Sequence, residues 1–111
     1  MAVSDDYLDF IRDRFDRLGY ITIRRMFGGA GVYCDGIIFA LVADNVLYLK
    51  VDDSNRGDYE DAGSEPFRPY GDDGGAMSYY EVPVDVLEDD DRLLAWARKA
   101  MVVGAKRKKR R

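Results

Sequence analysis

Three glycines within four residues, Gly28, Gly29 and Gly31, form a segment whose composition could do chemistry. Glycines let backbone N–H groups approach an anion closely, as they do in phosphate-binding loops. Such a loop is followed by a helix whose N-terminus supplies free donors, whereas Val32 and Tyr33 predict a strand here. We therefore interpret the glycines as a tight turn or a bulge between strands. Binding of a small anion at the Gly28 to Gly31 loop is the alternative.

Arg24 and Arg25, shortly before the glycines, are the candidate partner-binding residues. Neighbouring side chains of a strand point to opposite faces, so the two guanidinium groups do not act as one clamp. Arg25 shares its face with Ile21 and Ile23. This position predicts that Arg25 is partly buried and paired with a carboxylate.

The sequence lacks the residues that most hydrolytic and zinc-dependent enzymes use. It contains no histidine, which is the commonest general base and metal ligand, and a single cysteine, Cys34. The sequence identifies no cationic neighbour that would activate Cys34, so we interpret it as a structural thiol. Residues 52–57 resemble the start of a calcium-binding loop, but Arg56 stands at the fifth ligand position and Gly63 where a glutamate belongs. We predict no catalytic site, no metal and no cofactor.

The strongest charge feature is a basic tail of six residues, Lys106, Arg107, Lys108, Lys109, Arg110 and Arg111. The whole chain has 17 basic and 21 acidic residues and a net charge of −4, so the first 105 residues hold 11 basic against 21 acidic side chains. Such an acidic body repels phosphate backbones. Two interpretations of the tail stay open: a flexible arm that contacts nucleic acid weakly, and a solvated tail that offsets the acidic body.

Hydrophobic periodicity predicts a helix at the start of the chain. Apolar residues recur at intervals of three and four over residues 4–18, with Ser4 as the N-cap and Gly19 as the stop. From Ile21 the period changes to two, which indicates a strand that ends before Gly28.

Two-residue turns predict an antiparallel meander after this strand. Asp35-Gly36 and Asp44-Asn45 separate apolar runs at residues 32–34, 37–43 and 46–51. We expect these runs to form a three-strand meander, with the Ile21 strand as an extension or a fourth member. The run at 37–43 is apolar on both faces, so we expect it to be central or covered on both sides.

The second half of the chain predicts two helices and one strand. Residues 52–62 favour a short, weak helix, and residues 77–82 alternate as a strand that Pro83 ends. The last helix is expected from about Asp89 to Val103, with Gly104 as its end. The basic tail has no apolar residue to bury, so we expect it to be disordered.

Together these elements predict an α+β fold in which a single antiparallel sheet packs against an N-terminal helix, a short middle helix and a C-terminal helix. The length of 111 residues suits one domain, assigned to residues 1–104, followed by a disordered basic tail at 105–111. No apolar run approaches the roughly 20 residues of a membrane-spanning helix. Residues 1–17 lack the pattern of a signal peptide, so we expect a cytoplasmic protein.

Several segments match the N-terminal domain of the TfoX/Sxy family in order and spacing. They are residues 24–33 (RRMFGGAGVY), residues 47–50 (LYLK), Pro66-Phe67, residues 77–83 (MSYYEVP) and Trp96. The matching segments, taken with the first helix, span nearly the whole chain to about Val103. The sequence therefore resembles a stand-alone N-terminal domain of this family, without the second, C-terminal domain of its full-length regulators.

The resemblance implies a compact α+β domain with a non-enzymatic role. Family members are linked to natural competence, in which the full-length protein resembles a coactivator that works with the cyclic-AMP receptor protein. The family supplies no catalytic residues to transfer. We therefore expect an adaptor or coactivator domain that binds a protein partner, such as a transcription factor. Direct nucleic-acid binding through the basic tail and anion binding at the glycine loop are the alternatives.

Overall fold

A single antiparallel sheet forms the centre of the computed structural model, which describes residues 3–26, 28–67 and 78–109, with side chains as far as residue 106. The spatial order of its strands is β1-β2-β3-β4-β6. The strands are β1 (Ile21–Met26), β2 (Gly29–Cys34), β3 (Ile37–Ala43), β4 (Val46–Lys50) and β6 (Tyr79–Glu81). The predicted α+β class is confirmed, β3 is the central strand, and the Ile21 strand is a full member of the meander.

The two predicted hairpin turns are confirmed by their backbone angles. Asp35 and Gly36 have φ values of 51° and 85°, and Asp44 and Asn45 have values of 52° and 59°. Positive φ at both central residues is the signature of a type I′ turn, whose twist matches that of the strands it joins. These short connections fix β2, β3 and β4 as direct neighbours.

Four α-helices accompany the sheet in the described ranges. They are α1 (Asp5–Phe15), which continues as a 3₁₀ turn over Asp16–Leu18, α2 (Arg56–Asp61), α3 (Val84–Leu87) and α4 (Asp90–Lys109). Ser4 caps α1 as predicted, because its Oγ accepts a hydrogen bond from Tyr7 N at 3.1 Å. The sequence reasoning missed α3, which is a single turn after Pro83 and too short to show periodicity. No helix in these ranges has both the length and the apolar character to cross a bilayer.

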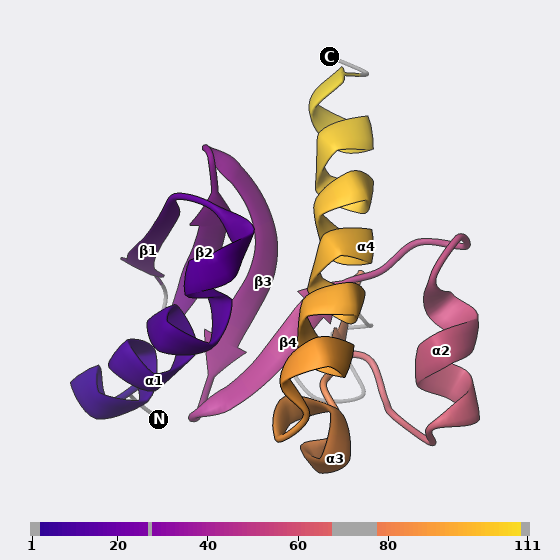
Figure 1. The fold of residues 1–111 in the computed structure, drawn as a ribbon, viewed down its shortest axis with the longest axis horizontal. Helices are drawn as coiled ribbons and strands as arrows, with labels where there is room; N and C mark the ends of the chain where they lie inside the picture. Colours follow the sequence, from indigo (N-terminus) through magenta and orange to yellow (C-terminus); the bar gives the residue numbers. More distant parts are fainter. Residues whose placement is uncertain (1–2, 27, 68–77, 110–111) are drawn as a thin grey trace.

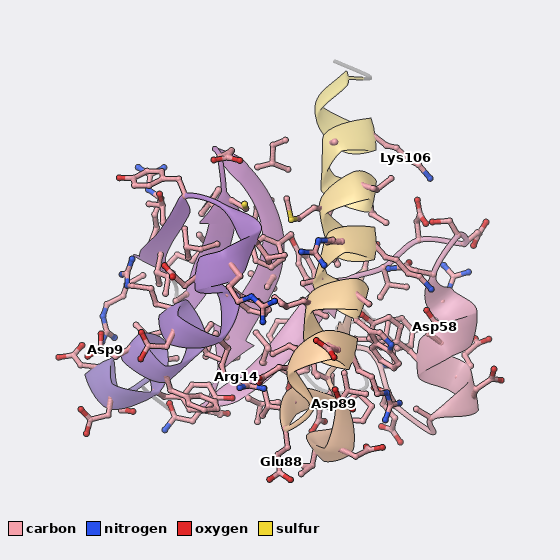
Figure 2. The ribbon with its side chains drawn as sticks, viewed as in Figure 1. Asp9, Arg14, Asp58, Glu88, Asp89 and Lys106 are labelled. Carbon is pink, nitrogen blue, oxygen red and sulfur yellow. The ribbon has the colours of Figure 1, made fainter. Side chains whose placement is uncertain are left out.

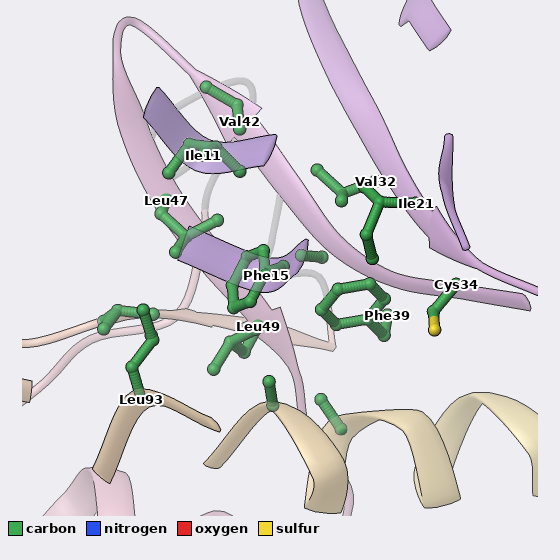
Figure 3. Close-up of a cluster of buried hydrophobic side chains, with 14 of the residues drawn as sticks. Ile11, Phe15, Ile21, Val32, Cys34, Phe39, Val42, Leu47, Leu49 and Leu93 are labelled. Carbon is green, nitrogen blue, oxygen red and sulfur yellow. The ribbon is translucent and has the colours of Figure 1, made fainter. Parts of the chain in front are cut away.

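The helices α1 and α4 lie on the same side of the sheet (Figure 1). The core fills the space between this helical layer and the sheet face turned toward it, as the close-up in Figure 3 shows. Phe15 of α1 meets Phe39 of β3 edge-to-face, with ring centroids 5.1 Å apart. Leu93 of α4 and Leu49 of β4 are both fully buried in the same cluster.

The end predicted for the last helix at Gly104 is wrong, because α4 continues to Lys109. At Gly104, α4 passes close to β3: a Cβ atom there would lie 2.5 Å from the Ile38 carbonyl oxygen and 2.9 Å from Ile37 Cγ2. The glycine therefore permits a close crossing and does not act as a cap. The disorder expected for the basic tail is accordingly wrong for residues 105–109, which are helical, while residues 110 and 111 lie outside the described residues.

The connection between α2 and β6 completes the sheet on one side. Pro66 forms a bridge to Tyr80, Phe67 N donates to Tyr79 O at 2.7 Å, and Glu81 N donates to Glu65 O at 3.1 Å. These contacts cover the outer edge of β6. Met77, where we expected the last strand to begin, lies outside the described residues, and the strand itself is observed at Tyr79–Glu81.

Candidate protein-binding surface

The glycine loop is built into the sheet. Gly29 and Gly31 belong to β2, which pairs with β1 on one side and β3 on the other. The backbone groups of a strand with two neighbours are taken up by the two ladders. A Cβ atom on Gly29 would lie 2.5 Å from the Val42 carbonyl oxygen, so this glycine permits close backbone approach. Gly28 has a φ of 79° in the turn before β2. The interpretation as a tight turn between strands is confirmed, and the pairing of Gly29 and Gly31 gives no support to anion binding at this loop.

The two candidate arginines lie on opposite faces of β1, as predicted. Arg25 donates a hydrogen bond to Val3 O at 2.9 Å and forms an ion pair with Asp5, which ties the edge strand to the start of α1. It is half exposed, and exposed ion pairs of this kind contribute about 0.2–1 kcal/mol. The pairing with a carboxylate is thus confirmed, whereas the partial burial is less than expected. Arg25 is committed to its own chain.

Arg24 lies at the end of a row of residues that crosses the whole sheet. The strand registers pair Arg24 with Gly31, Gly31 with Leu41, Leu41 with Tyr48, and Tyr48 with Glu81. Residues paired directly across strands point to the same face. The next row, which includes Ile23, Val32, Ala40 and Leu49, points to the opposite face and into the core. The Arg24 row therefore lies on the face away from α1 and α4, which we call the open face.

The centre of the open face is apolar. A Cβ atom on Gly31 would lie 2.9 Å from Met26 Cε, 3.1 Å from Ile38 Cδ1 and 3.3 Å from Tyr33 Cε1, so the tips of these side chains converge over the glycine. All three are half-buried, as is Leu41 beside them. No described helix packs on this side of β1, β2 and β3 (Figure 1). Contiguous apolar surface of this kind is typical of a site where a protein binds.

The edges of the open face are charged and differ in sign. Arg24 on β1 and Glu81 on β6 are both exposed. Burial raises the pKa of the Tyr48 hydroxyl, and the negative charges of Glu81 and Asp44 raise it further. The Tyr48 ring is held against Phe67, with centroids 4.8 Å apart. The open face thus presents a cation at one edge, an apolar centre and an anion beside aromatic rings at the other edge.

Cys34 and Asp52 are the two side chains most able to take part in a reaction, and neighbouring groups hold both of them in place. The Cys34 side chain is fully buried, and burial first and the adjacent Asp35 second raise the pKa of its thiol. A thiol held protonated is a poor nucleophile, so the interpretation as a structural thiol is confirmed. Hydrogen bonds from the Ser54 hydroxyl and backbone lower the pKa of Asp52, which also contacts Lys106 at 3.4 Å. No group of three metal-ligating side chains occurs among the described residues.

Sequence reasoning missed a buried polar contact at the end of β4. Lys50 is only 8% exposed, and its Nζ donates to the Tyr79 hydroxyl at 3.3 Å and lies 4.6 Å from the ring centroid. The buried Asn55 accepts from Asp52 N at 2.8 Å and donates to Lys50 O at 3.1 Å. Lys50 and Tyr79 are 29 positions apart in the chain, so no local sequence pattern predicts their contact. These contacts fix the start of the segment that leads to α2.

The described part of the basic tail lies on α4 (Figure 2). Lys106 contacts Asp52. Seven residues earlier on α4, Lys99 contacts Asp58 of α2 at 2.7 Å. Both lysines are about half exposed. The side chains of Arg107, Lys108 and Lys109 lie outside the described part of the structure, as do Arg110 and Arg111. The helical backbone carries three of these basic residues as a continuation of α4.

Two layers, with helices on one face of an antiparallel sheet and a second face without a described helix, define a two-layer α+β domain. The chain belongs to the TfoX N-terminal domain family, whose model matches residues 13–103. The match runs from within α1 almost to Gly104 and so covers the sheet and its helical layer. A search of curated proteins returned no match to the chain.

Proposed function

We propose that this domain regulates transcription by binding a protein partner and catalyses no reaction of its own. The observation that carries the proposal is the open face, where Met26, Tyr33, Ile38 and Leu41 form an apolar surface next to the exposed Arg24. Membership of the TfoX N-terminal domain family supports the same role. The state of Cys34, protonated and buried, gives no support to nucleophilic chemistry.

The partner proposed from the family resemblance is a transcription factor of the cyclic-AMP receptor class, acting in competence or a related programme. Arg24 supplies a guanidinium group that suits a carboxylate on such a partner, while the apolar centre supplies the buried area. Arg25 does not contribute, because it is bound to Val3 and Asp5. The proposed partner-binding set is therefore Arg24 together with the apolar centre of the open face.

The test is a titration of fluorescently labelled cyclic-AMP receptor protein, with its nucleotide, by the purified chain. We expect saturable binding that Leu41→Asp weakens by about 100-fold, since a carboxylate would be desolvated at the centre of the contact. Arg98→Glu on the exposed side of α4 is the matched surface control and should leave binding unchanged. The proposal fails if no binding is seen up to about 100 µM, which corresponds to roughly −5.5 kcal/mol, or if Leu41→Asp binds as well as the natural chain.

A second candidate function, contact with nucleic acid through the basic tail, is favoured by one observation. The backbone of α4 stays helical to Lys109, so Lys106 and the three basic residues after it belong to a helix. If all six basic residues met phosphates, affinity for duplex DNA would fall by roughly a thousandfold between 50 and 200 mM salt. The test compares the intact chain with a chain that ends at Ala105. Equal binding by both, or by neither, removes this candidate.

A further inference from the structure

The open face has opposite charges at equal distances from its centre. In the row that crosses the sheet, Leu41 lies on the central strand, with Arg24 two strands away on one side and Glu81 two strands away on the other. With neighbouring strands about 4.8 Å apart, each charge lies about 10 Å from Leu41. If a copy of this row is reversed and laid over the original with the Leu41 residues aligned, its positive end lies over the negative end of the original.

The two charged side chains lie at the surface of the described part of the chain. Arg24 and Glu81 are both exposed, and neither forms an ion pair with a residue in the described ranges. Between them lie the apolar contacts over Gly31, together with Leu41 and Tyr48. A surface that is apolar at its centre and charged at its rim has the anatomy of a protein–protein interface.

We propose that a second copy of this chain occupies the open face and forms a symmetric, face-to-face dimer. In this dimer a two-fold axis runs parallel to the strands and passes by Leu41. The axis places Arg24 of each copy opposite Glu81 of the other, and the two Leu41 side chains meet at the centre. Such an isologous contact uses the same patch twice, which the charge pattern of this row satisfies without any further partner.

The size of the face indicates a weak and reversible dimer. The row is about 19 Å wide, and strands of three to seven residues limit the extent of the face along the strands. The contact is therefore smaller than the roughly 800 Å² per partner of a standard stable interface. We expect a dissociation constant of about 1–100 µM, with dimer formation weakened by salt.

The inference rests on the proposed function, because the same face would bind the protein partner. Self-association then regulates that site: a copy in the dimer has its apolar centre and Arg24 covered. Partner binding and dimer formation compete, so the apparent affinity for the partner falls as the concentration of the chain rises.

The experiment is sedimentation equilibrium of the purified chain from about 5 to 500 µM, a range that spans the expected constant. Arg24→Glu puts like charges opposite Glu81, and Glu81→Arg puts like charges opposite Arg24. Since each change affects two contacts per dimer, we expect each single variant to dimerise at least about tenfold more weakly. An equimolar mixture of the two variants restores both attractions in a heterodimer, and its affinity should return to that of the natural chain.

Matched controls separate this contact from a general effect of net charge. Arg98→Glu and Glu60→Arg change exposed residues on α4 and α2 by the same charges, and neither they nor their mixture should alter the equilibrium beyond that general effect. Circular dichroism verifies that every variant is folded. A natural chain that stays monomeric at 500 µM overturns the inference, as does a dimer that the single variants leave intact or that the mixture fails to restore. A monomer that still binds the receptor protein overturns the dimer alone, whereas a dimer that never binds it overturns the proposed function alone.

Discussion

Replacing Gly104 by alanine tests whether this glycine serves a close helix crossing. In an ordinary helical position the change from glycine to alanine stabilises a protein by about 1 kcal/mol, because alanine is the better helix former. At Gly104 the added Cβ would lie 2.5 Å from the backbone oxygen of Ile38 and 2.9 Å from Ile37 Cγ2. No side-chain rotation relieves a contact with backbone, so overpacking costs about 1–3 kcal/mol. We therefore expect Gly104→Ala to be destabilised by about 0–2 kcal/mol.

Gly57 in α2 is the matched control, because a Cβ atom there meets nothing within 4 Å and its φ is not positive. Gly57→Ala should stabilise the domain by about 0.5–1 kcal/mol. The helix-propensity contributions of the two variants cancel in their difference, so that difference, about 1–3 kcal/mol, isolates the contact with β3. The assay is urea unfolding followed by the fluorescence of Trp96 and by circular dichroism.

A third variant separates a crossing glycine from a capping glycine. A glycine that ends a helix in the left-handed region is replaced by asparagine at little cost, whereas Gly104→Asn should be less stable than Gly104→Ala because the side chain is larger. The reasoning is refuted if Gly104→Ala unfolds at the same or higher urea concentration than Gly57→Ala, or if Gly104→Asn is as stable as the natural chain.

Three further predictions concern single side chains. The hydroxyl of Tyr59 is buried without a hydrogen-bond partner in the described chain, so Tyr59→Phe should be neutral or stabilising by up to about 1 kcal/mol in urea unfolding, and a loss of that size would contradict the assignment. The lowered pKa of Asp52, caused first by the Ser54 hydroxyl, gives stability that is present above its ordinary value of 3.8 and is lost as pH falls through the folded value. Between about pH 5 and pH 2 the melting temperature of the natural chain should therefore fall further than that of Asp52→Asn, and parallel curves would refute the contribution. Cys34 should react with a thiol reagent at pH 8 more than about 100-fold more slowly in the native protein than in urea, and equal rates would show that its burial is misassigned.

The elements predicted correctly are those with local signals. The alternation after Ile21 and the turns Asp35-Gly36 and Asp44-Asn45 act within a few residues, and they suffice to define four strands and their order. The α1 helix likewise has its cap, Ser4, within its first turn. In each case the signal and the structure that it determines are contiguous in the chain.

The elements predicted wrongly depend on contacts between distant residues. Gly104 was interpreted as a helix end because glycine commonly fills that role, but its neighbour is Ile38, which is 66 positions earlier in the chain. The basic tail was expected to be disordered because it has no apolar residues to bury. A helix that is already formed can continue into the tail without burying apolar side chains, and α4 does so to Lys109. Lys106 in this extension contacts Asp52.

The open face illustrates a signal that was present but ambiguous. The sequence identified residues 37–43 as apolar on both faces, which favours a central strand or one covered on both sides. The structure makes β3 central and places the described helices on one side, so Leu41 and Ile38 remain half-buried on the other. Sequence reasoning placed Arg24 and Arg25 on opposite faces correctly. The sequence did not show that Arg25 is the one with an ion pair, because its partner Asp5 lies in α1.

The position of α4 at the end of the described chain affects how the protein leaves the ribosome. The meander from β1 to β4 is complete by Lys50, yet Leu93, Leu94, Ala97 and Ala100, which cover its core face, are made only about 50 residues later. At a translation rate of roughly 5–20 residues per second, α4 is synthesised on the order of several seconds after Phe39 and its neighbours. During synthesis the core face of the meander therefore stays without its α4 cover over this interval.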